Sequence, residues 1–132
     1  MPVVSRFLRI VSFALVAMVL SGSRSLEAQA PKSLEDDLRR MLGAVMTNSY
    51  DKFLSNADPT FRVSMNKELF AAARKGLEPR LKTGYDTAYL GSMKQQGFTI
   101  HLFKLSCKDK GDDFLVKMGI QTSGKVVGFT IE

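Results

Sequence analysis

The sequence predicts an α+β domain in two layers, in which N-terminal helices pack on a four-stranded antiparallel meander. Apolar residues recur at helical spacing up to about residue 82, whereas apolar and polar residues alternate after it. Turn signals then divide the second half into four short runs. Helices followed by consecutive short strands are typical of α+β folds and not of parallel α/β folds.

The first thirty residues are predicted to be an export signal. Arg6 and Arg9 precede an uncharged run at 10–20, and small and polar residues follow it, ending in the Ala-Gln-Ala cleavage pattern at 28–30. The apolar run is much shorter than the roughly 20 residues that a transmembrane helix needs, so membrane contact is expected only if the signal stays uncleaved. Pro31 is a poor residue after a cleavage site, which leaves the exact site open.

Residues 31–132 are predicted to form a single domain with one modest core. With residues 1–30 removed, the chain carries 16 Lys and Arg against 12 Asp and Glu, a net charge of about +4. The basic residues are scattered among acids without interleaved aromatic residues, so no nucleic-acid partner is expected. Cys107 is the only cysteine, which excludes an internal disulfide. We expect it to be a small strand residue, with an intermolecular disulfide or a reactive thiol as the alternatives.

The first helix is predicted to begin at Ser33 and to run for about four turns. The Ser33 hydroxyl can cap the free amides and the Asp36 carboxylate can reach back, as in a capping box. Apolar residues recur along one side of this segment, and charged residues occupy the other. The apolar stripe comprises Leu34, Leu38, Met41, Leu42 and Val45.

Two further helices are expected before the strands. A break at 47–49 precedes a short helix at 50–54, and this helical segment ends at Asp58-Pro59. Asn66 is a suitable N-cap for the next helix. The predicted buried stripe of that helix is Leu69, Phe70, Ala73, Leu77 and Leu81. Pro79 lacks an amide donor and clashes with the carbonyl four residues earlier, so we expect a kink or a restart there.

Four strands are expected in the second half, at 88–94, 98–107, 114–122 and 125–131. The third strand alternates apolar and polar residues, which predicts a sheet buried on one side. The second strand instead has apolar residues on both faces. Phe98, Ile100 and Leu102 lie on one face, and Phe103, Leu105 and Cys107 lie on the other. Helices are therefore expected to cover one face of this strand, and a partner subunit the other.

Four stretches carry a resemblance to a known superfamily. They are the end of the first helix at 48–51 (Asn-Ser-Tyr-Asp), the helix at 66–81, the stretch 89–97 and the closing run 124–129. Through them, residues 33–132 resemble the nuclear transport factor 2-like (SnoaL-like, cystatin-like) superfamily, and within it the small exported bacterial domains of unknown function. The resemblance implies a curved sheet wrapped round helices with a conical cavity between them. It does not imply one function, because this scaffold hosts isomerases, cyclases, dehydratases, inhibitors and binding domains.

Few residues suit the proton-transfer chemistry of the enzymes in that superfamily. Those enzymes place a carboxylate in the cavity, often with a histidine or a tyrosine, but no predicted strand interior of this chain contains a carboxylate. The candidate catalytic residues are His101, which is the sole histidine, and Tyr50 and Asp51 on the helices. About 20 Å of strand separates His101 from Cys107, which excludes a Cys–His dyad. With no second histidine, neither a metal site nor a cofactor is expected.

Two function classes remain open. The first is an exported, non-catalytic module, periplasmic or secreted, that binds a small apolar ligand or a protein partner. The second is a cavity enzyme of the isomerase or dehydratase type that uses His101 with a tyrosine. The absence of strand carboxylates favours the first class. The residues expected to line the ligand cavity are Phe70, Tyr89, Phe98 and Phe129.

A homodimer through the sheet face is also expected. One apolar set of the second strand would otherwise face water in a patch larger than a monomer normally shows, and a symmetric dimer would cover it. The expected interface residues are Phe103, Leu105, Leu115 and Val127. Replacing Phe103 or Leu105 with aspartate is then expected to give a monomer or an aggregate.

Overall fold

The computed structural model describes residues 30–132, which form four helices followed by a sheet of four strands. The helices are α2 (Lys32–Thr47), α3 (Tyr50–Phe53), α4 (Pro59–Ser64) and α5 (Lys67–Leu81), and the strands are β1 (Tyr85–Gln95), β2 (Phe98–Cys107), β3 (Phe114–Ile120) and β4 (Val126–Ile131). The predicted export signal lies outside the described residues, apart from Ala30. None of the helices in this described part is both long enough and apolar enough to span a membrane.

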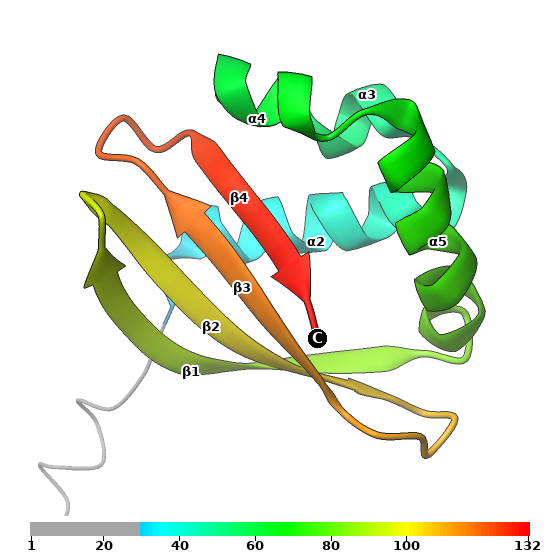
Figure 1. The fold of residues 1–132 in the computed structure, drawn as a ribbon. Coiled ribbons are helices and arrows are strands. Elements are labelled where there is room, and N and C mark those ends of the chain that lie inside the picture. Colours follow the sequence, from blue (N-terminus) through cyan, green and yellow to red (C-terminus); the bar gives the residue numbers. More distant parts are fainter. Residues whose placement is uncertain (1–29) are drawn as a thin grey trace, which may run out of the picture.

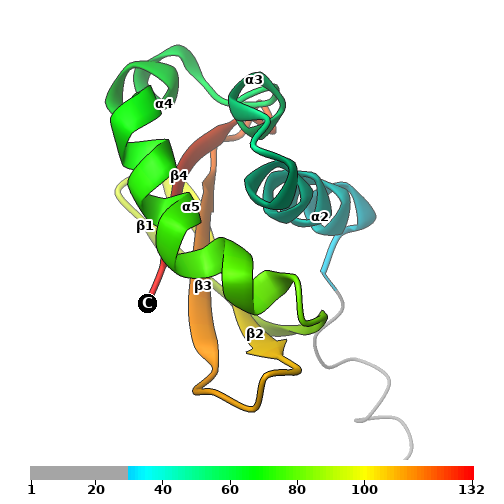
Figure 2. The ribbon, with the colours of Figure 1, turned by 90° about the vertical axis from the view of Figure 1, so that its right-hand side faces the viewer.

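The sheet is an antiparallel meander with the strand order β1-β2-β3-β4. Helix α2 crosses one face of the curved sheet, here called the inner face, and α5 lies beside the β4 edge (Figures 1 and 2). The described helices leave the opposite, outer face open (Figure 1). Helices followed by a four-stranded antiparallel meander confirm the predicted α+β class.

The core lies between α2 and the inner face of the sheet. Every residue of the predicted α2 stripe is buried, with exposed fractions of 0–3%. The residues opposite the stripe are Phe103 and Leu105 of β2 and Val116 and Met118 of β3. Phe103 pairs with Val116 across the two strands, so the four side chains form one continuous surface. Burial of each such side chain contributes roughly 1.5–3 kcal/mol, which makes this layer the main source of stability.

The expectation that Phe103 and Leu105 lie at a subunit interface is wrong. They are 2% and 0% exposed, and they face α2. Leu115 and Val127 are half-buried on the outer face instead, where the side chains of Val127 and Ile100 both lie close to Gly119. Because side chains alternate along a strand, Phe103 cannot share a face with Leu115 in this register. The helices cover the Phe103 set, and the Ile100 set faces outward.

The first helix starts one residue earlier than predicted. Helix α2 begins directly after Pro31, and its N-cap position has no side-chain hydrogen bond, so the predicted capping box of Ser33 and Asp36 is wrong. Ser33 already lies within the helix, where its hydroxyl cannot occupy the capping position. The Pro31 carbonyl accepts hydrogen bonds from the Leu34 and Glu35 amides instead.

Helix α5 is capped as predicted but does not restart at Pro79. The Asn66 side chain accepts a hydrogen bond from the Leu69 amide at 2.9 Å. The helix continues through Pro79 to Leu81, and because proline has no amide hydrogen, the helical hydrogen bond to the Lys75 carbonyl is lost. Leu69 is 52% exposed, and Ala73 is exposed too, in contrast to the predicted stripe. The buried residues of α5 are Phe70, Leu77 and Leu81.

The sequence did not predict helix α4, because the predicted helical segment ends at Asp58-Pro59, where α4 begins. The Asp58 carboxylate caps α4 by accepting a hydrogen bond from the Phe61 amide at 2.9 Å, and Pro59 takes the first helical position. The Asp58 amide also donates to the Val126 carbonyl, within a parallel bridge between Ala57 and Val126. This short segment covers the start of the β4 edge.

Candidate functional site: an apolar cavity beside the fourth strand

An apolar cavity lies between α5, the end of α2 and the β3–β4 side of the sheet. Its volume is about 350 Å³, which is within the range of small-molecule pockets. Helix α5 contributes Phe70, Ala72, Ala73, Gly76 and Leu77, the strands contribute Phe114, Phe129 and Ile131, and Val45, Phe53 and Met65 complete the wall. The cavity occupies the region where α5 runs beside β4 (Figure 1).

Small residues on α5 leave the space for this cavity. Phe70 is 3% exposed and anchors the helix against Phe53, with ring centroids 5.2 Å apart. Leu77, at 6% exposed, anchors it two turns later. Ala73 and Gly76 line the cavity between these anchors, and a Cβ atom added at Gly76 would meet no atom within 4 Å. The helix is thus held at two points while the stretch between them leaves the cavity unfilled.

None of the described residues that line this cavity is ionisable. Two charged residues of α5 near the cavity are paired with each other. Arg74 forms an ion pair with Glu78 at 2.8 Å and donates from Nε to the Val45 carbonyl at 2.9 Å. A hydrogen bond from Lys82 is the main cause that lowers the pKa of Glu78, which therefore stays ionised. The cavity can bind an apolar group, but its lining supplies no acid, base or nucleophile.

Two of the four residues that the sequence assigned to the cavity line it in the structure, and two do not. Phe70 and Phe129 line it, and Phe129 packs edge-on against Phe53 with ring centroids 5.6 Å apart. Tyr89 and Phe98 do not line it, because they lie toward the far edge of the sheet on β1 and at the start of β2. The sequence reasoning missed Ala72, Ala73 and Gly76. The run of small residues inside α5 was the available signal for them.

The three candidate catalytic residues are not brought together. The Tyr50 hydroxyl donates to the Met65 carbonyl, and its ring packs on Phe70, so it has a structural role. Asp51 is exposed in the first turn of α3. His101 lies on the inner face of β2, where the fully buried Met118 separates it from Phe129 and the cavity.

His101 nevertheless has a tyrosine as its neighbour. The Tyr89 hydroxyl lies 2.9 Å from His101 Nδ1, within hydrogen-bonding distance. Burial lowers the pKa of His101 below its ordinary value. His101, but not Tyr89, lines a second hollow at the end of the sheet, whose volume is about 400 Å³. No carboxylate lines this hollow among the described residues.

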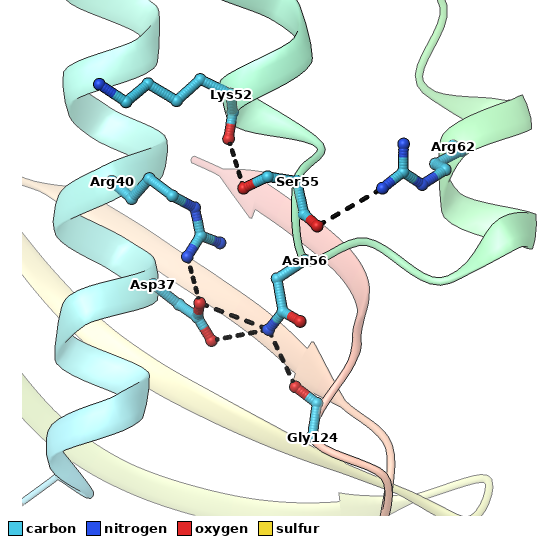
Figure 3. A network of polar contacts seen from close by, with 7 residues as sticks. All are labelled: Asp37, Arg40, Lys52, Ser55, Asn56, Arg62 and Gly124. Atoms are coloured by element: carbon cyan, nitrogen blue, oxygen red, sulfur yellow. Dashed lines mark hydrogen bonds and ion pairs between the residues drawn. The ribbon is translucent and has the colours of Figure 1, made fainter.

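A buried carboxylate, Asp37, joins three segments of the chain (Figure 3). Arg40 Nη1 donates to Asp37 Oδ1 at 2.6 Å, and Asn56 Nδ2 donates to Asp37 Oδ2 at 3.2 Å. The same Asn56 amide lies 3.1 Å from the Gly124 carbonyl. The network ties α2 to the turn before α4 and to the β3–β4 turn. Its carboxylate is used within the protein, so we assign it a structural role.

The remaining reactive groups do not form a metal or thiol site in the described part of the chain. Residues 30–132 contain no cluster of three or more potential metal ligands. Cys107 is buried at the end of β2, and burial is the main cause that raises the pKa of its thiol. A buried thiol with a raised pKa is a poor nucleophile at neutral pH.

Comparison with known proteins gives a likeness of fold. No protein-family model and no curated protein matches this sequence. Among solved structures, the chain is similar to an NTF2-like (nuclear transport factor 2-like) protein of unknown function from Cytophaga hutchinsonii, with 10% identity, 81% of this chain and 93% of that chain covered, and a TM-score of 0.37. At this TM-score the likeness carries no argument about this chain.

Proposed function

We propose that this chain is an exported, non-catalytic domain that binds a small apolar ligand in the cavity beside α5. The observation that carries the proposal is the cavity of about 350 Å³, whose lining is apolar and contains no ionisable group. An apolar ligand would gain about 25 cal/mol for each Å² of apolar surface removed from water. The same lining offers no group for proton transfer, which favours binding over catalysis.

The proposal is tested by titrating the purified protein with N-phenyl-1-naphthylamine, an uncharged dye whose fluorescence rises in apolar surroundings. We expect saturable binding of one dye per chain. Ala73→Phe places a ring at the cavity wall and is expected to weaken dye binding at least about tenfold, the loss of roughly 1.4 kcal/mol. Ala71→Phe is the matched control, because Ala71 is an exposed alanine of the same helix that does not line the cavity.

Two results would contradict the proposal. Dye binding that does not saturate would indicate general surface adsorption. Equal dye affinities for the Ala73→Phe and Ala71→Phe variants would place the dye outside the cavity. A circular dichroism melt of each variant checks that the fold is retained.

We propose export on the basis of the predicted signal at residues 1–30. Cell fractionation is expected to recover the protein outside the cytoplasm, in the periplasm or in the medium. Intact-mass measurement of that material then gives the cleavage site and decides whether cleavage occurs before Pro31. Recovery of the full-length chain in the cytosol would refute this part of the proposal.

We also propose a homodimer through the outer face of the sheet, with a different residue set from the one that the sequence indicated. The outer face bears half-buried Ile100, Leu102, Leu115 and Val127. Met93, which pairs with Ile100, is 50% exposed at one end of the same face. A second copy would remove this apolar surface from water.

The alternative of a cavity enzyme is favoured only by the contact between Tyr89 and His101. The pair lacks a neighbouring carboxylate and is separated from the apolar cavity by Met118. We therefore propose a binding function for the cavity and treat the His101 hollow as a separate site.

A further inference from the structure

A β-bulge in β1 places two polar side chains on the inner face beside His101. Strand β1 pairs with β2 at Tyr89–Phe103, leaves Leu90 unpaired, and resumes with Gly91 opposite Leu102 and Ser92 opposite His101. Gly91 has a φ of +132° at this point, a conformation that glycine adopts without strain. In a regular strand, Tyr89 and Ser92 would point to opposite faces, so the bulge is what brings both to the His101 face.

The Tyr89 contact fixes the orientation of the His101 ring. The Tyr89 ring packs on buried Phe103, with centroids 5.2 Å apart, which holds the hydroxyl 2.9 Å from His101 Nδ1. Burial lowers the pKa of His101, which favours the neutral imidazole. When the Tyr89 hydroxyl donates to Nδ1, the ring proton lies on Nε2. Nε2 has no hydrogen-bond partner within residues 30–132, so in that tautomer its N–H group is free to bind a ligand.

The hollow in front of this ring has basic, polar and apolar residues but no acid. Its volume is about 400 Å³, and it lies at the end of the sheet where the β1–β2 and β3–β4 turns meet (Figure 1). Lys94, Gln121 and Thr122 supply polar groups, and Phe98 and Ile120 supply apolar surface. Lys94 takes part in no ion pair with any residue of the described part.

We propose that this hollow is a second binding site, for a small carboxylic acid with a short or flat apolar body. The Lys94 ammonium and the His101 Nε2–H group are donors for the two carboxylate oxygens, and a hydrogen bond to an ionised partner is stronger than a neutral one. Phe98 and Ile120 contact the apolar body of the ligand. The positive charge of Lys94 and the absence of acids from the lining select an anion over an amine.

The test uses the fact that His101 is the only histidine of the chain. Its ring therefore gives a single set of imidazole signals in NMR spectra of the purified full chain. Benzoate is the probe, and benzamide is its uncharged control of nearly the same shape. We expect benzoate at millimolar concentration to shift the His101 signals in a saturable way, and benzamide to bind at least about threefold more weakly.

Two substitutions make the test specific. Lys94→Gln is expected to weaken benzoate binding about threefold to tenfold, whereas Lys104→Gln, which removes an exposed lysine that does not line the hollow, leaves it unchanged. Tyr89→Phe keeps the ring but removes the hydroxyl, and is expected to change the ¹⁵N shifts that report the His101 tautomer.

Three results would overturn the inference. The first is a set of His101 signals that benzoate does not move. The second is an equal affinity for benzamide and benzoate, and the third is a loss of affinity in Lys104→Gln as large as in Lys94→Gln. An unchanged tautomer in Tyr89→Phe would refute the role of the Tyr89 hydroxyl. None of these measurements involves the apolar cavity, so they are independent of the proposed function.

Discussion

Gly76→Leu is expected to stabilise the protein and to close the apolar cavity at the same time. Gly76 lies in the interior of α5, where glycine costs about 1 kcal/mol relative to a good helix former. A Cβ atom there meets nothing within 4 Å, so the new side chain enters the cavity without a clash. Partial burial of the leucine adds up to about 1 kcal/mol, less than the 1.5–3 kcal/mol of full burial.

The expected gain is therefore about 1–2 kcal/mol in the free energy of unfolding. For a domain of this size that is a rise in Tm of roughly 5–15 °C. Thermal melts followed by circular dichroism measure the gain, and urea titrations measure the free energy directly. Titration with the same uncharged dye is expected to show at least about tenfold weaker binding, because four added carbon atoms occupy part of the cavity.

Gly43→Leu is the matched control for this prediction. Gly43 is also a helical glycine with open space at Cβ, but it lies on α2 and does not line the cavity. It should give the helix-propensity gain of about 1 kcal/mol and leave dye binding unchanged. A lower Tm for Gly76→Leu would mean overpacking and would refute the cavity as described. Unchanged dye affinity in Gly76→Leu would refute the cavity as the binding site.

Three further predictions follow from the packing and the charges. Leu102→Asp on the outer face is expected to convert the proposed dimer to a folded monomer in light scattering. Phe103→Asp buries a charge in the core and is expected to unfold the protein, and a folded Phe103→Asp variant would contradict the core assignment. Burial lowers the folded-state pKa of His101, so below pH 6.5 the unfolded chain binds more protons than the folded one, and the free energy of unfolding should rise with pH there and level off above it. His101→Gln should remove this rise in urea titrations. An identical pH profile in the variant would show that another group causes it. Asp37→Ala removes the acceptor of Arg40 and leaves Asn56 bonded only to the Gly124 carbonyl, so it is expected to cost about 2 kcal/mol in urea unfolding. A loss below about 0.5 kcal/mol would mean that the network is not structural.

The order and type of the main elements could be predicted from local pattern alone. The stripe from Leu34 to Val45 repeats at the helical period, and the alternation in β3 repeats at the strand period, so each indicates its own element without knowledge of its neighbours. Asn66 is a cap for a similar reason, because its bond to the Leu69 amide spans only three residues. The local pattern was less accurate next to prolines. Helix α2 begins directly after Pro31, one residue before the predicted start, and α5 continues through Pro79 in its last turn.

The apolar cavity and the His101 hollow are built from residues that are far apart in the sequence, so no local sequence pattern predicts them. β2 carries apolar residues on both faces, and only the position of α2 decided that Phe103 faces inward and Ile100 outward. The cavity forms because Ala73 and Gly76 lie opposite Phe129 and Ile131, more than fifty residues later in the chain. The pair of Tyr89 and His101 requires both the β1–β2 register and a bulge that the sequence marks only by Gly91. Sequence periodicity determines which side of an element is apolar, whereas packing between elements determines which apolar side is covered and where space is left unfilled.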